Sequence, residues 1–399
     1  MSEQWPIMTL GEVIHEMKDG GTPKRSVPEN FGGDITWCVV KDIKPEIFDS
    51  KEKLTQQGLD GSSAKLWPAG SIIISLGATI GKIGIARVPT ATKQGLSGIV
   101  VNKELILAEF LVYLLHHKVK EIQELATGTT IKEVRPRKLM SELKLPVPSL
   151  EEQKRIVSIL DEAFEKIEHN CIQLQTKITD AEDLFSSILY SEFSDNIETW
   201  SESELSEIAY TAGRIGWKGL TAKEYTDSGP LFLSVHSLNY GHHVDFRDAN
   251  HISQQRYDES PEIMLESNDI LICKDGAGIG KLGIINHVPN PSTINGSLLL
   301  IRASEKLVPK FLYYCLLSPY FQSIVQSRLE GSTTPHLYQR DIKQFPVRFP
   351  ATSLQKEIVE KLDIIAADYE NLLNNFSDGM KNFNELKQSI LQEAFNGNL

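Results

Sequence analysis

The chain has 399 residues, 41% of them apolar and 24% charged, which allows two to four domains with ordinary hydrophobic cores. It contains no run of about 18 apolar residues and no secretory signal at residues 1–6, so we expect a cytoplasmic protein without a membrane span. Its four cysteines form no C-x-x-C pair, which argues against a zinc site, and its net charge of −12 at first argues against contact with nucleic acid phosphates.

The first predicted element that bears on function is a tight turn at residues 20–25, where two glycines precede a threonine and two cations. A strand and its exit follow near residues 37–41. Hydroxyl and guanidinium groups can contact base edges in a DNA groove, and lysines can hold phosphates. The candidate contacts in this region are Thr22, Lys24, Arg25, Trp37 and Lys41.

A buried strand is predicted at residues 71–75, and the glycine-rich segment Gly77–Ile85 follows it. This segment departs from the phosphate-loop pattern G-x-x-x-x-G-K-[ST], because its spacing is one residue short and Ile83 replaces the Ser or Thr that would hold magnesium. We interpret it as a strand-to-strand turn whose glycines adopt positive φ, from which Lys82 contacts a phosphate of a bound polynucleotide. The alternative is a structural turn with an ordinary exposed lysine.

Hydroxyl and basic side chains also gather near the end of this first globular part. The candidate contacts there are Thr129, Thr130, Lys132 and Arg135. No serine, cysteine or carboxylate grouping at a diagnostic spacing accompanies them, and the histidines are scattered. We therefore predict neither catalytic nor metal-ligating residues.

A long helix is predicted to follow Pro148, with Ser149 as its N-cap. Apolar residues recur along it at alternating steps of three and four for more than four heptads, which is typical of a coiled-coil seam. The seam residues that we expect to mediate helix pairing are Val157, Leu160, Phe164, Ile167, Leu174 and Ile178.

The second half of the chain repeats the first at an offset near 200 residues. Seven of nine positions are identical between Gly77–Ile85 and Gly276–Ile284, and the residues around Gln153 recur around Gln355. Internal duplication explains why these similar blocks occur in one order. It divides the chain into two globular parts and two helical parts, at residues 1–149, 150–196, 197–351 and 352–399.

The beginning of the second globular part differs most from the first, so we expect it to make different contacts. It has Gly213–Gly219 where the first part has Gly20–Pro23. The candidate contacts in the second part are Arg214, Trp217, Lys218, His236, Asn239, Tyr240, Lys281, Thr333, His336, Tyr338 and Arg340.

The second long helix, with Ser353 as its predicted N-cap, carries a seam like that of the first. Two narrow seams of similar length suit a two-stranded coiled coil, so we expect the helices to pair with each other. The alternative is that each helix packs on its own globular part. The seam residues of the second helix are Val359, Leu362, Tyr369, Leu373, Phe376 and Met380.

Most of the excess acid lies on the two helical parts. Residues 151–193 and 351–399 together hold 8 basic and 18 acidic residues, whereas the rest of the chain holds 33 and 35. The globular surfaces can therefore be locally basic, and the net charge does not exclude nucleic acid binding.

This arrangement resembles the specificity subunit of type I restriction-modification systems over the whole chain. The resemblance rests on several short motifs that are weak singly and specific together. They are Leu10–Val13, Gly20–Pro23, Trp37, Gly81–Gly84, Gly128–Thr130, Leu145–Pro148 with Gln153 and Ile156, and, in the second half, Gly280–Gly283, Pro350, Gln355, Ile358 and Ser389–Leu391.

The resemblance implies an α+β protein with an internal pseudo-twofold repeat. Two mixed α/β target-recognition domains would be separated by two long helices that form an antiparallel coiled coil. Each domain would recognise one half of a split double-stranded DNA target, and the helices would set the gap and bind two DNA methyltransferase subunits. Restriction and translocase subunits would complete the complex, and the partners would bring S-adenosylmethionine, ATP and Mg²⁺, so that this chain binds no cofactor and catalyses nothing.

Two other hypotheses remain open at this point. A coiled-coil scaffold without sequence-specific DNA binding would show no steep dependence of DNA affinity on salt. A phosphate-loop enzyme would turn over nucleotides and would depend on Lys82 and Lys281.

Overall fold

The computed structural model describes residues 5–128, 132–194, 197–214, 220–329 and 336–399. The chain divides into two compact units, one formed by residues 1–173 and 379–399 and the other by residues 174–378. Each unit therefore combines a globular part with two helical segments that are distant in the sequence. No helix within the described ranges combines the length and the apolar character that a membrane crossing requires.

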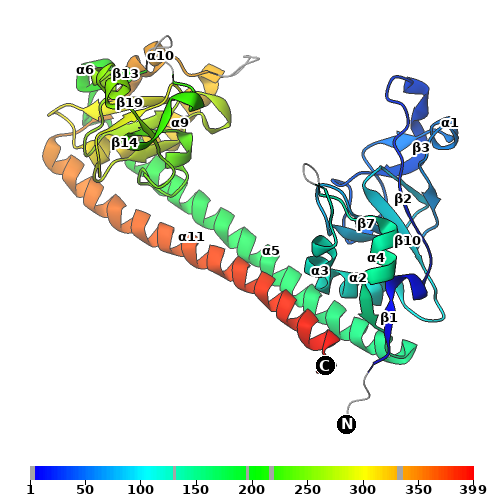
Figure 1. The fold of residues 1–399 in the computed structure, drawn as a ribbon. Helices are drawn as coiled ribbons and strands as arrows, with labels where there is room; N and C mark the ends of the chain where they lie inside the picture. Colours follow the sequence, from blue (N-terminus) through cyan, green and yellow to red (C-terminus); the bar gives the residue numbers. More distant parts are fainter. Residues whose placement is uncertain (1–4, 129–131, 195–196, 215–219, 330–335) are drawn as a thin grey trace. The chain divides into compact units, whose positions relative to one another are not determined.

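The globular part of the first unit is built on β-sheets covered by short helices (Figure 1). One sheet has the strand order β2-β10-β7-β8-β4, another has the order β5-β3-β9-β6, and β1 pairs with β11. The strands are β1 (Ile7–Thr9), β2 (Ile14–Asp19), β3 (Phe31–Cys38), β4 (Glu46–Ile47), β5 (Lys53–Leu54), β6 (Leu66–Trp67), β7 (Ile72–Ser75), β8 (Ile83–Ala86), β9 (Thr90–Thr92), β10 (Leu96–Val101) and β11 (Lys144–Pro146). The helices are α1 (Gln56–Asp60), α2 (Ala108–His117), α3 (Val119–Glu124) and α4 (Pro136–Glu142).

The second unit has sheets with the orders β13-β19-β16-β17 and β15-β14-β18, and β12 pairs with β20. Its strands are β12 (Ser201–Glu204), β13 (Ala209–Gly213), β14 (Tyr225–Leu233), β15 (Asn250–Ile252), β16 (Ile270–Cys273), β17 (Leu282–Ile284), β18 (Ser292–Ile294), β19 (Leu298–Ala303) and β20 (Pro346–Phe349). Its helices are α6 (Leu205–Ile208), α7 (Gln254–Asp258), α8 (Pro309–Leu317), α9 (Pro319–Leu329) and α10 (Gln339–Lys343).

The same topology occurs in both units. The order β2-β10-β7-β8 of the first unit corresponds to β13-β19-β16-β17 of the second, and all three pairings in each set are antiparallel. The parallel pair β3 and β9 likewise corresponds to the parallel pair β14 and β18. The predicted buried strand near residues 71–75 is β7, its counterpart in the second unit is β16, and every residue of both strands is buried. The predicted duplication is therefore confirmed.

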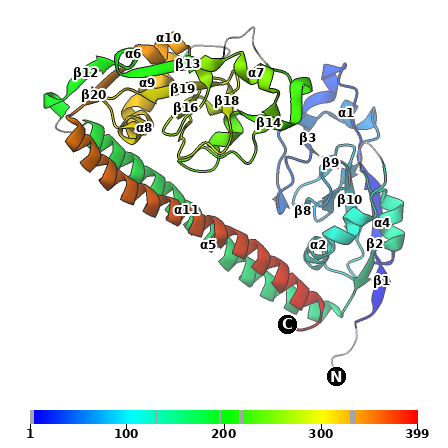
Figure 2. The ribbon, with the colours of Figure 1, turned by 60° about the vertical axis from the view of Figure 1, so that its left-hand side comes forward.

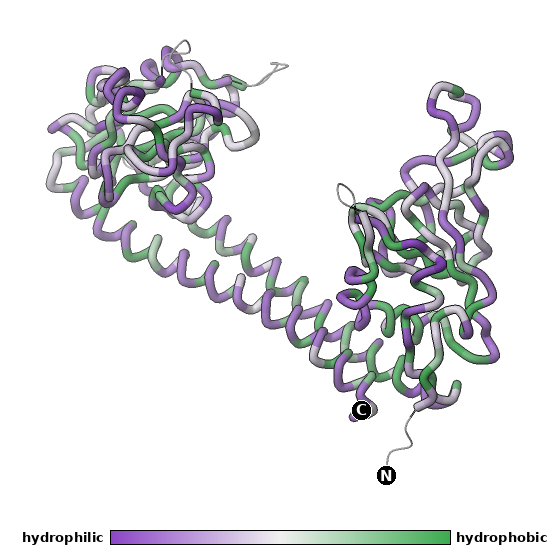
Figure 3. The backbone as a smooth tube through the Cα atoms, in the orientation of Figure 1, coloured by the Kyte–Doolittle hydropathy of each residue, from purple (hydrophilic) through white to green (hydrophobic). Residues whose placement is uncertain are grey.

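The two long helices are α5 (Leu150–Ser194) and α11 (Thr352–Phe395), and they lie side by side in both views (Figure 2). Apolar positions recur along them between hydrophilic ones (Figure 3), and every predicted seam residue is buried or half-buried. In the first unit, the start of α5 meets the end of α11. The Arg155 guanidinium donates to the Leu399 carbonyl oxygen over 2.6 Å, and the Lys387 Nζ lies 5.8 Å from the centroid of the Phe164 ring.

In the second unit, the end of α5 meets the start of α11. The Phe185 and Tyr369 rings stack with their centroids 4.7 Å apart, and Lys361 forms an ion pair with Glu192. Higher residue numbers on α5 thus face lower numbers on α11 in both units. This confirms the predicted antiparallel pairing of the helices.

Both alternatives for the helices hold, because each helix packs on a globular core as well as on the other helix. The core of the first unit includes apolar residues from the start of α5 and from the end of α11. The core of the second unit includes residues from the start of α11 and from the end of α5. The helical residues in these cores are Ile156, Leu160, Leu391, Ala394 and Phe395 in the first unit, and Phe185, Leu189, Phe193, Ile358, Val359, Leu362 and Ala366 in the second.

A buried glutamine ties the beginning of each helix to its globular part. The side-chain carbonyl of Gln153 accepts from the Leu107 N–H over 2.8 Å, and its amide donates to the carbonyl oxygens of Leu105 and Pro148. Gln355 makes the corresponding three bonds, to the Val308 N–H and to the carbonyl oxygens of Lys306 and Pro350. These bonds explain why the sequence around Gln153 recurs around Gln355.

One predicted N-cap is confirmed and the other is wrong. The Ser149 hydroxyl accepts from the Glu152 N–H over 3.3 Å at the start of α5. Helix α11 begins at Thr352, so Ser353 lies inside its first turn. There the Ala351 carbonyl already accepts from the Gln355 N–H, which places the helical hydrogen bonds earlier than the sequence pattern suggested.

Candidate nucleic-acid interface

In the first unit, the ends of several strands bring five loops to one edge. Asp19 at the end of β2 pairs with Ser97, and Ser75 at the end of β7 pairs with Leu96, so β2 and β7 both end at the start of β10. The parallel pair β3 and β9 ends at Cys38 and Thr92. We define the first loop edge as residues 20–25, 39–42, 76–82, 93–95 and 127–134, of which residues 129–131 are not described.

Backbone hydrogen bonds join these loops into one surface. The Gly20 and Gly21 N–H groups donate to the carbonyl oxygens of Leu96 and Thr92, and the Lys93 N–H donates to Cys38. The Leu76 N–H donates to the Gly95 carbonyl over 2.9 Å, and the Leu76 carbonyl accepts from Val134 over the same distance. Candidate residues from four separate stretches of sequence are thereby brought together.

Three exposed lysines of the first loop edge come from different loops. Lys41, Lys82 and Lys132 are exposed, and the Lys82 ammonium lies 3.5 Å from the Val40 carbonyl oxygen, beside Lys41. Within the described part of the chain, none of these three lysines makes a salt bridge. Their charges are therefore available to phosphates. Thr22, Lys24 and Arg135 are also exposed on or beside this edge.

The glycine-rich segment is the predicted strand-to-strand turn. It joins the antiparallel strands β7 and β8, and Gly81 has φ +99°. A Cβ at Gly81 would also lie 2.7 Å from a Val119 methyl group, so both the positive φ and the close contact favour glycine at this position. No helix follows the turn, so the helix N-terminus that a phosphate loop requires does not occur here.

Trp37 is not a DNA contact, because its side chain is 0% exposed. Its indole N–H donates to the Gly21 carbonyl over 3.2 Å, and its ring contacts Phe31. Trp37 therefore supports the 20–25 loop from inside. The Arg25 guanidinium, placed 5.2 Å from the Trp37 ring, is held by both carboxylate oxygens of Glu52 at 2.6 and 2.7 Å.

The second unit has an equivalent edge, which we define as residues 234–240, 274–281, 295–297 and 336–338. The parallel strands β14 and β18 end together at Leu233 and Ile294. The Lys274 N–H donates to the Ser297 carbonyl, and the Lys274 carbonyl accepts from Leu337, both over 2.9 Å. These bonds correspond to those that join the loops of the first edge.

The side chains on the second loop edge differ from those on the first. Lys281 donates to the Asn239 side-chain carbonyl over 2.6 Å, and His336 is bonded to the Asp275 carboxylate. The Arg340 guanidinium lies 4.9 Å from the centroid of the Tyr338 ring. Exposed candidates on or beside this edge are His236, Asn239, Tyr240, Lys281, Tyr338 and Arg340, and His336 is half-buried.

Arg214 is a second candidate that does not lie on the surface, because it is only 4% exposed. Its guanidinium donates to the Ile294 carbonyl over 2.9 Å and to the Thr293 hydroxyl over 3.2 Å, and burial lowers its pKa. Arg214 therefore ties the end of β13 to β18. Five other candidates lie outside the described residues: Thr129, Thr130, Trp217, Lys218 and Thr333.

Lys93 and Lys274 also lie on the two edges and were not among the sequence candidates. Each directly follows a fully buried strand, β9 or β16, and bonds to a neighbouring loop through its backbone. A cation immediately after a buried strand was the pattern that could have indicated them. Among the described residues, no three His, Cys, Asp or Glu side chains come together in a way that could hold a metal ion.

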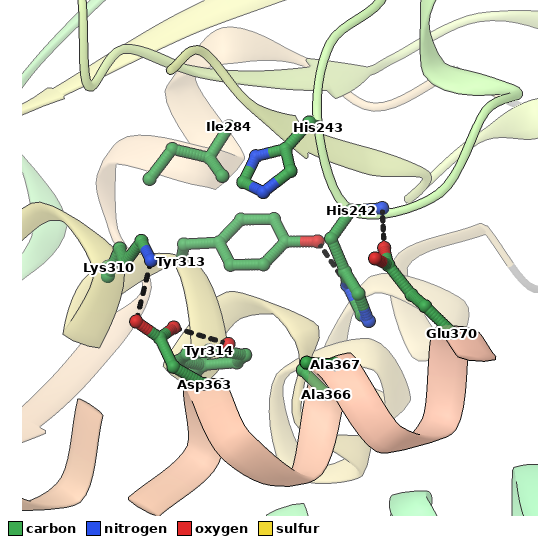
Figure 4. Close-up of a pocket in the computed structure, with 10 residues that line it drawn as sticks. All are labelled: His242, His243, Ile284, Lys310, Tyr313, Tyr314, Asp363, Ala366, Ala367 and Glu370. Atoms are coloured by element: carbon green, nitrogen blue, oxygen red, sulfur yellow. Dashed lines mark hydrogen bonds and ion pairs between the residues drawn. The ribbon is translucent and has the colours of Figure 1, made fainter. Parts of the chain in front are cut away.

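A cavity of about 230 Å³ lies in the second unit, where residues 242–243 meet α11 (Figure 4). Asp363 accepts from Lys310 over 2.6 Å and from the Tyr314 hydroxyl over 2.8 Å at one side of it. The first unit has the corresponding bond between Tyr113 and Asp161, but there Phe164 packs edge-on against Tyr113. Ala366 occupies the position of Phe164 in the repeat, which leaves the space open.

Comparison with known proteins identifies the family. The sequence model of the family described as "Type I restriction modification DNA specificity domain" matches residues 2–180 and again residues 197–375. The chain belongs to the type I restriction-modification specificity subunits. The two matches coincide with the two copies of the repeat, and family membership establishes a role in DNA-sequence specificity.

Relatives among the specificity subunits align over nearly all of this chain or over part of it. The chain is 25% identical to the MjaIX specificity subunit of Methanocaldococcus jannaschii over 393 residues, which cover 94% of this chain and 88% of the relative. It is 34% identical to the EcoR124I/EcoR124II specificity subunit of Escherichia coli over 161 residues, or 38% and 39% of the two chains. One solved structure concerns complex assembly and conformational transition of the type I R-M system. It has the same fold, with a TM-score of 0.73 at 22% sequence identity, and the alignment covers 100% of this chain and 99% of that chain.

Proposed function

We propose that this specificity subunit recognises a bipartite, asymmetric DNA target, with one loop edge on each half of it. The observation that carries the proposal is that the same edge is built twice and bears unlike side chains. Equivalent backbone hydrogen bonds support both edges, whereas the exposed groups are mostly lysines on the first and a mixture of amide, imidazole, phenol and cations on the second. A shared frame with different contact groups favours two unlike half-sites.

On the first edge, Lys41, Lys82 and Lys132 supply phosphate contacts, and Thr22, Lys24 and Arg135 lie beside them. On the second edge, base contacts come from exposed polar groups such as Asn239 and Tyr338. The candidates outside the described residues, Thr129, Thr130, Trp217, Lys218 and Thr333, are retained as part of this proposal. Trp37 and Arg214 are not.

The paired helices set the gap between the half-sites, and the chain has no catalytic site of its own. Two DNA methyltransferase subunits bind it and supply S-adenosylmethionine and the methylation of adenine, which requires the base to be flipped out of the duplex. Restriction and translocase subunits with ATP and Mg²⁺ complete the complex. A scaffold without sequence-specific DNA binding is not favoured, because the chain belongs to a family of DNA-specificity subunits.

Selection from a randomised duplex library tests the proposal directly. The full chain, assembled with its methyltransferase subunits, is expected to enrich two short unlike motifs separated by a gap of fixed length. Sequencing of the bound DNA gives the result. Enrichment of one contiguous motif, of a palindrome or of no motif contradicts the bipartite, asymmetric target.

The lysines of the first loop edge should contribute to affinity through released counterions. The double substitution Lys41→Ala and Lys82→Ala is expected to reduce the slope of log K against log[salt] by about 1.8, because each phosphate contact contributes about 0.9. Fluorescence anisotropy at several salt concentrations measures this slope. Lys103→Ala is the matched control, since Lys103 is exposed just beyond the opposite end of β10. An equal slope for the double variant and the control would remove these two lysines from the interface.

A further inference from the structure

In the second loop edge, the orientation of one side-chain amide is fixed by a lysine. The Lys281 Nζ lies 2.6 Å from the Asn239 Oδ1, and both residues are exposed. A lysine ammonium has donors and no acceptor, so only the carbonyl oxygen of the Asn239 amide can face it. The two N–H donors of the Asn239 amide therefore point away from Lys281, and the ammonium itself keeps further donors.

The loop that carries Asn239 is anchored on both sides. On the N-terminal side, the Asn239 N–H itself donates to the His236 carbonyl over 3.0 Å. After it, the His242 N–H donates to a Glu370 carboxylate oxygen on α11 over 3.0 Å, and the His242 Nδ1 lies 2.8 Å from the Tyr313 hydroxyl (Figure 4). The amide is thus presented from a supported loop and not from a free one.

The equivalent lysine of the first edge makes a different contact. Lys82 corresponds to Lys281 in the repeat, and its ammonium lies 3.5 Å from the backbone carbonyl of Val40. Val40 lies two residues beyond the end of β3, as Val235 lies two residues beyond the end of β14, so Lys82 meets a backbone carbonyl and not a side-chain amide. The arrangement of a lysine that orients an asparagine is therefore a property of the second edge.

A group of donors whose one acceptor already binds an ammonium matches one base better than the others. In the major groove guanine presents two acceptors, O6 and N7, whereas adenine presents an acceptor and the N6 amino donor. An asparagine pairs with adenine through both of its amide atoms. Lys281 already donates to the Asn239 carbonyl, so the N6 amino donor of adenine would have to share that oxygen with an adjacent ammonium, which disfavours adenine. We propose that Asn239 and Lys281 form a donor pair that selects guanine over adenine at one position of the second half-site. This inference rests on the proposed contact between the second loop edge and DNA.

The test is selection of the second half-site by the full chain together with its methyltransferase subunits, using a duplex library randomised in that half. The wild type is expected to select guanine at the position that depends on Asn239. Lys281→Met frees the Asn239 carbonyl, so the preference at that position is expected to move from guanine to adenine by about tenfold, the lower range of one base contact. Asn239→Asp removes the amide donors and is expected to abolish the guanine preference.

Lys306→Met is the control, because Lys306 is exposed just beyond the other end of β19, away from the second loop edge. It is expected to select the same half-site as the wild type. If Lys281→Met lowers affinity equally for all four bases, Lys281 is only a phosphate contact and the inference is wrong. If the wild type selects a second half-site without guanine, the inference fails while the proposed function stands, and if it selects no sequence, both fail.

Discussion

Replacing Gln153 with leucine is expected to lower the free energy of unfolding of the first unit by about 3 kcal/mol, because buried polar groups left without partners cost about 1–3 kcal/mol each and some regain water. The Gln153 side chain is 0% exposed and satisfies the Leu107 N–H and the carbonyl oxygens of Leu105 and Pro148. Leucine fills a similar volume but satisfies none of them. Calorimetric unfolding of the full chain measures the change, which corresponds to roughly 6–12 °C in Tm for a unit of this size.

The repeat and the helix supply controls for this result. Gln355→Leu should lower the stability of the second unit by a similar amount, because Gln355 makes the same three bonds. Gln175→Leu places the same substitution on an exposed position of α5 and should change the free energy of unfolding by less than about 0.5 kcal/mol. If Gln153→Leu were as mild as Gln175→Leu, the hydrogen bonds of the buried amide would not stabilise the junction between the helix and its globular part.

Features that depend on local periodicity could be predicted from the sequence. The seams of α5 and α11 follow from apolar residues at steps of three and four, and this period specifies a helix with one narrow buried face. The turn at Gly81 follows from glycines between two apolar runs. The duplication also predicted that the strand framework and the long helix of one unit recur in the other.

Features that depend on which distant segment covers a side chain could not be predicted in the same way. Trp37 lies near cations in the sequence and resembled a surface contact, but β9, more than 50 residues later, pairs with its strand and leaves the ring buried. Arg214 stands among glycines and resembled a loop cation, yet its partners are 46 to 80 residues away. The neighbouring residues in the sequence suggested a surface position for both side chains, whereas the pairing of strands determined that they are buried.

The same limit applies to the extent of helix packing. The sequence offered two exclusive alternatives for the long helices, pairing with each other or packing on their globular parts. In each unit, the beginning of one helix and the end of the other enter one core. A seam period cannot show this, because the additional buried positions, such as Ile156 and Phe395, lie outside the seam and only at the helix ends.

Removing one heptad from each long helix is expected to shorten the preferred gap in the DNA target by about three base pairs. Seven residues span about 10.5 Å along a helix, and base pairs are spaced by about 3.4 Å. Residues 170–176 of α5 and 378–384 of α11 are suitable, because each is one full heptad of the seam and the two segments face each other in the register of the Phe185–Tyr369 pair. Methylation of a library that varies only in gap length, by the chain assembled with its methyltransferase subunits, measures the preference.

A deletion from both helices preserves the seam, whereas deletion of residues 170–176 alone leaves the helices unequal in length. The single deletion is therefore the control, and it is expected to lower helix pairing and Tm and to abolish methylation at every gap length. The double deletion should keep the far-UV circular dichroism per residue and lose activity on the original target while gaining it on the shortened one. If the double variant folds and still prefers the original gap, the helices do not determine the spacing, and the distance between the half-sites must be set by the partner subunits.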